Sequence, residues 1–320
     1  MKLFSLLICA ICALYVTPMA AHAQWVLSKG PSGGSVVCLA VNGPNASQPM
    51  LFEGTYGGGV FRSSDNGTSW MPAKAGLTAT DVISLVASDN NLFAGTLRGG
   101  VFLSTNNGTN WFPINMGMTD TTVNALIMNG PILFAGTSKG GVFRSTDNGS
   151  TWSAVNNGLA NTFVKAFAVI GSDLYAGTSG GGVFLSTDNG MDWTAVNAGL
   201  ADMNVQALTV IGTSLFAGTS GGVFRFADGG SNWTLANIGL KNTNVNAFAV
   251  SGTNLFAATR GDGVFLSTNN GAIWKAVSPG LTNTIVWSLT PSGANASRPM
   301  LFAGTNTGGV WRRPLLEMIP

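Results

Sequence analysis

The stretch LFAGTSKGGVFRSTDNGSTW, residues 133–152, decides the fold because near-copies of it fill most of the chain. The leucine that opens each copy recurs seven times, with steps of 41, 41, 41, 41, 40 and 46 residues: Leu51, Leu92, Leu133, Leu174, Leu215, Leu255 and Leu301. A period near 40 residues indicates an architecture of stacked or radially arranged repeats.

Each repeat predicts four short strands. In the second copy, apolar or β-prone runs cover residues 82–87, 92–96, 100–105 and 111–115, and glycine-rich or asparagine-rich turns separate them. The inner runs are apolar on both faces, which is typical of a sheet packed between two neighbours. We therefore predict an all-β protein, a seven-bladed β-propeller of four-stranded antiparallel blades.

Tryptophans mark the start of the fourth strand and predict how the ring closes. Six copies carry the marker, and the last copy ends at residues 311–314, WRRP, without one. Trp25 precedes the run SVVCLAV, residues 35–41, as Trp70 precedes DVISLVA, residues 81–87. We predict that an N-terminal strand at 24–27 completes the last blade, whose other strands cover 286–290, 301–305 and 309–312. Closure within one blade leaves no open sheet edge.

The N-terminus has the pattern of a secretory signal peptide. Lys2 is followed by an apolar run at 3–16 and by the small-x-small sequence AHA at 21–23. Isoleucine precedes both Cys9 and Cys12, which argues against lipid attachment. We predict a signal peptide at 1–23, a propeller at 24–314 and a short C-terminal tail at 315–320. The protein is expected to be secreted or periplasmic, or displayed at the cell surface.

Removal of the signal peptide would restrict the kinds of catalytic and metal-binding sites that the chain can form. It takes the only histidine, His22, and leaves Cys38 as the only cysteine, which we interpret as a small buried residue. A Ser-His-Asp triad and a zinc site of His and Cys ligands are then excluded. Without Lys2, 14 basic side chains face 13 acidic ones with no basic cluster, so no nucleic-acid partner is expected. No membrane-spanning stretch follows residue 23. We expect a monomer with no metal and no cofactor.

An eight-residue box, STDNGSTW in residues 145–152, follows the third strand. It recurs at 63–70, 104–111, 186–193, 226–233 and 267–274. It resembles the Asp-box, the bacterial neuraminidase repeat, whose pattern is S-x-D-x-G-x-T-W. Its polar side chains can accept backbone N–H bonds, and one aligned carboxylate per box is too few for calcium. We predict structural roles for the third and last box positions: Asp65, Trp70, Asn106, Trp111, Asp147, Trp152, Asp188, Trp193, Asp228, Trp233, Asn269 and Trp274.

The resemblance implies several functional classes and establishes none. Asp-box propellers include sialidases, xyloglucanases, sortilin receptors, photosystem II assembly factors and secreted bacterial propellers; this chain is most similar to the last group. In these families the boxes lie away from the functional loops. A sialidase also needs three converging arginines, whereas four arginines here occupy one repeated position around the ring: Arg62, Arg144, Arg225 and Arg312. Xyloglucanase-like action would need two facing carboxylates and a second propeller.

The predicted functional face is formed by the GTxxGG turns and the GLxxTxV links. A variable column also follows the first valine of each inner strand: Val37, Ile83, Asn124, Lys165, Gln206, Asn246 and Trp287. Its polar members predict either a water-filled channel wall or a ligand site. Our candidate ligand-binding residues are these: Tyr56, Arg98, Asp120, Asn124, Lys139, Lys165, Asp202, Gln206, Asn246, Arg260, Asp262 and Trp287.

Glu53 stands where the six other copies have alanine. We expect a solvated or arginine-paired side chain; the alternative is a catalytic acid whose pKa burial raises. From all of these patterns we predict an exported scaffold with no catalytic residues, which binds a glycan or protein partner at the channel mouth. The alternative function is an Asp-box glycoside hydrolase, sialidase-like or glucanase-like, that uses two of four aspartates: Asp81, Asp120, Asp202 and Asp262.

Overall fold

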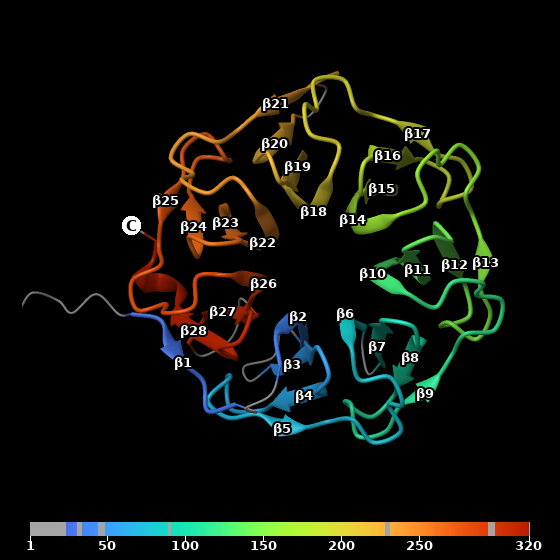
Figure 1. Cartoon of the computed structure of the whole chain (residues 1–320), viewed down its shortest axis with the longest axis horizontal. Helices are drawn as coiled ribbons and strands as arrows, with labels where there is room; N and C mark the ends of the chain where they lie inside the picture. The colour runs from blue at the N-terminus through green and yellow to red at the C-terminus, as the bar shows by residue number, and fades with distance from the viewer. Residues whose placement is uncertain are drawn as a thin grey trace, which may run out of the picture.

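Seven sheets of four antiparallel strands stand around a common axis and follow one another in chain order (Figure 1). The computed structural model describes residues 24–30, 34–43, 49–88, 91–227, 231–293 and 298–319. The expected signal peptide and Asp228 of the fifth box lie outside these residues. The predicted all-β, seven-bladed propeller is confirmed.

Every blade has an inner, a second, a third and an outer strand. The inner strands face the axis: β2 (Val36–Asn42), β6 (Val82–Ser88), β10 (Val123–Asn129), β14 (Val164–Ile170), β18 (Val205–Ile211), β22 (Val245–Ser251) and β26 (Val286–Pro291). The second strands are β3 (Met50–Thr55), β7 (Asn91–Thr96), β11 (Ile132–Thr137), β15 (Asp173–Thr178), β19 (Ser214–Thr219), β23 (Asn254–Thr259) and β27 (Met300–Thr305).

The outer half of each blade is shorter. The third strands are β4 (Gly59–Ser63), β8 (Gly100–Ser104), β12 (Val142–Ser145), β16 (Gly182–Ser186), β20 (Val223–Phe226), β24 (Val264–Ser267) and β28 (Val310–Pro314). The outer strands are β5 (Met71–Pro72), β9 (Phe112–Pro113), β13 (Ser153–Ala154), β17 (Thr194–Ala195), β21 (Trp233–Leu235), β25 (Lys275–Ala276) and β1 (Val26–Leu27). A 3₁₀ helix, η1 (Leu315–Glu317), follows β28.

The outer strand of the second blade is shorter than its sequence predicts. We expected residues 111–115, but β9 covers only Phe112–Pro113. Beyond it, the side chain of Asn115 takes over the pairing: its Oδ1 accepts the N–H of Val101 at 2.7 Å, and its Nδ2 donates to the Gly99 carbonyl at 2.9 Å. A side-chain amide can satisfy backbone groups where the chain leaves a sheet.

The ring closes through its N-terminus, as predicted. β1 pairs with β28 in the register Val26 to Arg312 and Leu27 to Trp311, so the two ends of the chain share one blade (Figure 1). Trp25 is 3% exposed, and its Nε1 donates to the Val277 carbonyl of the preceding blade at 2.7 Å. Trp25 therefore takes the place that a box tryptophan takes in the other blades.

In five of the six boxes the tryptophan ties the turn to the previous blade; within the described residues Trp70 Nε1, of the first box, has no hydrogen-bond partner. In the third box, Ser145 Oγ accepts the N–H of Gly149 at 2.8 Å and Asp147 Oδ1 accepts the N–H of Thr151 at 2.9 Å. Trp152 Nε1 donates to the Ile114 carbonyl of the preceding blade at 2.7 Å. Hydrogen bonds led by those from Thr151 lower the pKa of Asp147 to about 2, which keeps this acceptor ionised.

Two arginines of the third strands, Arg62 and Arg312, also join neighbouring blades. Arg62 Nη1 donates to the Asn107 carbonyl at 3.1 Å and to Thr109 Oγ1 at 3.2 Å, both in the next box turn. Arg312 Nη1 makes the equivalent bonds across the closure, to the Asn66 carbonyl at 3.0 Å and to Thr68 Oγ1 at 2.7 Å. These two arginines are thus bound to box turns at the outer ends of the blades.

A buried side chain beneath a box turn, such as Phe134 beneath the fourth box, predicts which glycines are indispensable. Gly190 has φ 87°, and a Cβ there would lie 2.7 Å from Cε1 of Phe134. Gly171 has φ 62°, but a Cβ there would meet nothing within 4 Å. Gly190→Ala should therefore destabilise the protein by about 1–3 kcal/mol more than Gly171→Ala, since only the first adds a clash to the backbone strain. Urea unfolding of both variants measures the difference; equal losses would contradict it.

Candidate functional site

A β-bulge directs one side chain per blade toward the axis. The pairing of every inner strand with its second strand shifts by one residue directly after the first valine, as between Val123 and Ala125 in β10. The same shift occurs in the six other blades. A bulged residue lacks a partner in the ladder and re-aims its side chain. The bulged positions are the variable column of the sequence: Val37, Ile83, Asn124, Lys165, Gln206, Asn246 and Trp287.

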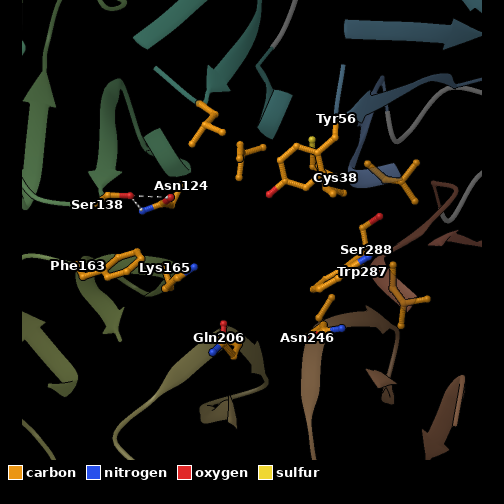
Figure 2. A pocket seen from close by; sticks show the side chains of 16 residues that line it. Cys38, Tyr56, Asn124, Ser138, Phe163, Lys165, Gln206, Asn246, Trp287 and Ser288 are labelled. Carbon is orange, nitrogen blue, oxygen red and sulfur yellow. Dashed lines mark hydrogen bonds between the residues drawn. The ribbon is translucent and has the colours of Figure 1, made fainter. Parts of the chain in front are cut away.

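The seven bulged side chains meet in one cavity of about 500 Å³ on the propeller axis (Figure 2). A cavity of this size falls in the range of small-molecule sites. Of the twelve candidate ligand-binding residues, six line it: Tyr56, Asn124, Lys165, Gln206, Asn246 and Trp287. The structure thus brings together the column that the sequence singled out.

Two of the amides hold the cavity wall as well as facing it. Asn124 Nδ2 donates to the Val164 carbonyl of the next inner strand at 2.9 Å, and Asn246 Nδ2 donates to the Val286 carbonyl at 2.9 Å. Asn124 also exchanges hydrogen bonds with Ser138 Oγ, at 3.1 and 3.3 Å (Figure 2). Their NH₂ groups are therefore engaged between blades.

Two aromatic rings of the wall, Trp287 and Phe163, lie close to cations. The Arg260 guanidinium lies 5.4 Å from the Trp287 ring, whose Nε1 donates to Asn306 Oδ1 at 3.1 Å. Lys165 Nζ lies 4.7 Å from the centroid of the Phe163 ring, and burial lowers the pKa of Lys165. In Figure 2, Lys165 and Trp287 project from opposite sides of the cavity.

The remaining candidates lie outside the lining. Arg98, Lys139, Arg260 and Asp262 are exposed at the tips of the turns between second and third strands. Asp120 Oδ2 accepts the N–H groups of Lys139 and Gly140, at 2.6 and 3.0 Å. Burial acts to raise the pKa of Asp120, but these bonds outweigh it and the pKa lies below its usual value.

Asp120 and Asp202 belong to a repeated turn and are not individual to their blades. Asp202 Oδ1 accepts the N–H of Asn204 two residues on, at 2.9 Å, and Asp120 Oδ1 accepts that of Thr122 at 3.0 Å. Asparagines make the same bond at the equivalent position of three further links: Asn161, Asn242 and Asn283. Such side-chain bonds two residues on shape the link itself. These aspartates are therefore occupied by backbone amides.

Sequence reasoning missed some of the lining. Leu97 and Ser138 occupy the first variable position of the GTxxGG turn, where Tyr56 also lies. Phe163 comes directly before the first valine of its inner strand. These two positions are joined by backbone bonds, as in Ser138 N–H to the Thr122 carbonyl at 3.1 Å. Both positions vary from blade to blade, and that variation was the signal that could have identified them.

The structure contradicts our expectation that Glu53 is solvated or arginine-paired. It is 1% exposed, and its two carboxyl oxygens have no hydrogen-bond partner among the described residues, so it is neither solvated nor arginine-paired. Burial raises its pKa from 4.5 to about 8. This pKa fits the alternative of a catalytic acid, but Glu53 lies in β3 outside the cavity lining.

Cys38 also differs from expectation, because it is only half-buried and lines the cavity. Its Sγ lies 3.7 Å from the Val82 carbonyl of the next inner strand. Burial is the main cause that raises the pKa of this thiol, so it stays protonated at neutral pH. A thiol in this state is a poor nucleophile.

In the part of the chain that the structure describes, no three His, Cys, Asp or Glu side chains gather in a group that could hold a metal ion. Nor does it contain a helix with the length and apolar character that crossing a membrane requires.

Comparison with known proteins identifies a family. Residues 45–166 and 119–239 match the family described as DUF6242 beta propeller domain, and together span residues 45–239, or 195 of 320 residues. Curated protein sequences give no match.

Solved structures share the fold at low identity. The extracellular domain of BT4673 from B. thetaiotaomicron, described as a one-component system, aligns with TM-score 0.70 and 17% identity over 91% of this chain and 40% of that one. The GH74 enzyme of Niastella koreensis aligns with TM-score 0.69 and 19% identity over 91% of this chain and 53% of that one. YCF48 bound to D1 peptide aligns with TM-score 0.71 and 14% identity over 91% of this chain and 96% of that one. The chain thus spans about half or less of the first two chains.

Proposed function

The chain belongs to the DUF6242 beta propeller domain family, and from the cavity at its centre we propose an exported, non-catalytic propeller that binds a glycan. The observation that carries the proposal is the ring of seven bulges. It gathers three polar amides and a tryptophan from blades far apart in sequence into a single cavity of about 500 Å³. A channel that only holds water would not require aromatic rings and amides together in its lining.

The lining suits a sugar ring. Trp287, Tyr56 and Phe163 offer apolar faces on which a pyranose ring can pack. Gln206 and the carbonyl oxygens of Asn124 and Asn246 offer hydrogen bonds to hydroxyl groups. Burial raises the pKa of Tyr56, so its hydroxyl remains a donor at neutral pH.

The carboxylates near the cavity support a binding role over hydrolysis. A glycosidase uses two carboxyl groups that flank the scissile bond. The described cavity lining contains none. Of the four aspartates of the hydrolase alternative, Asp81 accepts the Gly57 N–H at 2.7 Å, and Asp120 and Asp202 accept turn amides. Asp262 is exposed at a turn tip.

Export and an Asp-box relationship are parts of the same proposal. The N-terminal pattern of residues 1–23 supports export, as does the likeness to extracellular domains. The box turns support the Asp-box relationship because their serine, Asx and tryptophan side chains make one repeated set of bonds, in which Asn269 can replace aspartate.

Trp287→Ala tests the proposal directly. A glycan array identifies the bound oligosaccharide, and calorimetry then compares the wild-type protein with the variant. We expect Trp287→Ala to bind the oligosaccharide at least about tenfold more weakly than the wild-type protein does, since the aromatic contact with the sugar is lost. Phe112→Ala is the control, because Phe112 is 61% exposed on the outer strand β9. Capture of a protein partner with no glycan bound, or sialidase or glucanase turnover, would overturn the proposal.

A further inference from the structure

Among the described residues, Lys165 is the only charged side chain in the cavity lining. The other polar groups of the lining are neutral hydroxyls, amides, a thiol and an indole. Within the part of the chain that the structure describes, the one ion pair joins Arg298 to Glu317, and neither residue lines this cavity. The positive charge of Lys165 therefore lies in the wall without a carboxylate beside it.

The surroundings of Lys165 leave its charge available to a ligand. Its described contact is with the face of Phe163, which holds the ammonium 4.7 Å from the ring centroid and uses none of its N–H donors on an oxygen. The aspartates of the adjoining links, Asp120 and Asp202, accept backbone amides instead. Desolvation without a partner is costly, and an anion brought by a ligand would offset it.

Gln206 supplies a second donor next to this charge. Its strand β18 follows β14 in the ring, and its side chain lies beside that of Lys165 in Figure 2. Asn124, on the other side of Lys165, has its NH₂ group engaged by Val164 and Ser138. Gln206 has no hydrogen bond within the described residues. One ammonium and one free amide are suited to the two oxygens of a carboxylate.

Trp287 provides an apolar surface on the side of the cavity opposite Lys165 (Figure 2). The Arg260 guanidinium, outside the lining, is 5.4 Å from the Trp287 ring. A ligand that meets both walls therefore carries an acidic group at one end of a ring and an apolar face on that ring. A hexuronic acid unit has this arrangement, whereas a neutral hexose has only the apolar face.

We propose that the glycan bound in the cavity is acidic, with a uronate carboxylate held by Lys165 and Gln206 and its sugar ring on Trp287. This inference rests on the proposed glycan-binding function. It names the class of sugar and the residue that selects it.

The test compares uronate oligosaccharides with their methyl esters, in which a methyl group on the carboxyl oxygen removes the negative charge. Calorimetry would use oligomers of galacturonate, glucuronate and mannuronate, each beside its ester. We expect at least one acid to bind about tenfold more tightly than its ester, as a charge-assisted hydrogen bond predicts. Lys165→Gln should weaken binding of the acid about tenfold and leave binding of the ester unchanged, whereas Lys165→Arg should keep the preference.

Lys275→Gln is the matched control, because it removes the same charge from the outer strand β25. Equal binding of acid and ester, or the same loss in both glutamine variants, would overturn the inference and leave glycan binding standing. Binding of neutral oligosaccharides alone would also overturn this inference and leave glycan binding standing. Failure of every acidic and neutral oligosaccharide to bind would overturn the proposed function and this inference together.

Discussion

Replacing Trp25 by alanine should destabilise the propeller by about 3–5 kcal/mol, because a fully packed tryptophan is lost from the blade that closes the ring. Trp25 is 3% exposed and holds the preceding blade in two ways. Its Nε1 donates to the Val277 carbonyl at 2.7 Å, and its backbone N–H donates to the Pro279 carbonyl at 3.1 Å. Urea or thermal unfolding of the purified variant measures the loss.

Leu27→Ala is the control for Trp25→Ala. Leu27 lies on the same two-residue strand, but it is 49% exposed, so its truncation should cost less than about 1 kcal/mol. Deletion of residues 24–27 should lower the melting temperature further, since it removes the pairing of β1 with β28 and leaves a sheet edge open. An unchanged melting temperature after that deletion would show that closure of the ring does not depend on this strand.

Wild-type stability should fall as the pH rises from about 5 to 8, and Glu53→Gln should remove that fall. The carboxyl group of Glu53 has a pKa raised from 4.5 to about 8, with burial as the cause. Between these two pH values the folded protein holds a proton that the unfolded chain releases. The contribution of Glu53 to stability is therefore fully present below pH 4.5 and is lost as the pH rises to 8. At 1.36 kcal/mol for each pH unit, the difference corresponds to roughly 5 kcal/mol.

The environment of Glu53 explains why the glutamine variant should be insensitive to pH. Both carboxyl oxygens are buried without a partner among the described residues, so ionisation gains no hydrogen bond. Cys38 is the titratable neighbour, and burial first and the charge of Glu53 second raise its pKa. The thiol therefore stays neutral over this range.

Urea titrations at pH 5, 6, 7 and 8 measure the effect, with Glu317→Gln as the control. Glu317 is paired with Arg298 at the surface, so its loss should change stability by less than about 1 kcal/mol at every pH. A wild-type protein whose stability is level from pH 5 to 8, or a slope that survives in Glu53→Gln, would contradict the assignment.

Much of the candidate site follows from reading the repeats against one another. One variable residue follows the first valine of every inner strand, and the structure gathers all seven into one cavity. The same method misjudged the links. Asp120 and Asp202 look like variable residues until their bonds to Thr122 and Asn204 align them with asparagines of other blades.

The burial of Glu53 could not be predicted from its neighbours in the chain. The run LFEGT differs from LFAGT by one residue, and a strand alternates its side chains between two faces whatever lies against them. Whether the carboxyl group meets water, an arginine or apolar side chains depends on the blade packed beside β3. The first blade packs between the second blade and the last one, and the last one lies more than 230 residues further along the chain.

The sequence by itself determined the all-β class, the seven blades, the strand order within a blade and the closure through Trp25, because each depends on local patterns repeated every 41 residues. The tertiary structure alone decided which polar groups are bound to backbone, which are left unpaired in the core, and which face the cavity. Those properties depend on contacts between blades, such as the bond from Asn246 Nδ2 to the Val286 carbonyl of the next inner strand. The repeated pattern of one blade does not show which groups of the neighbouring blade lie against it.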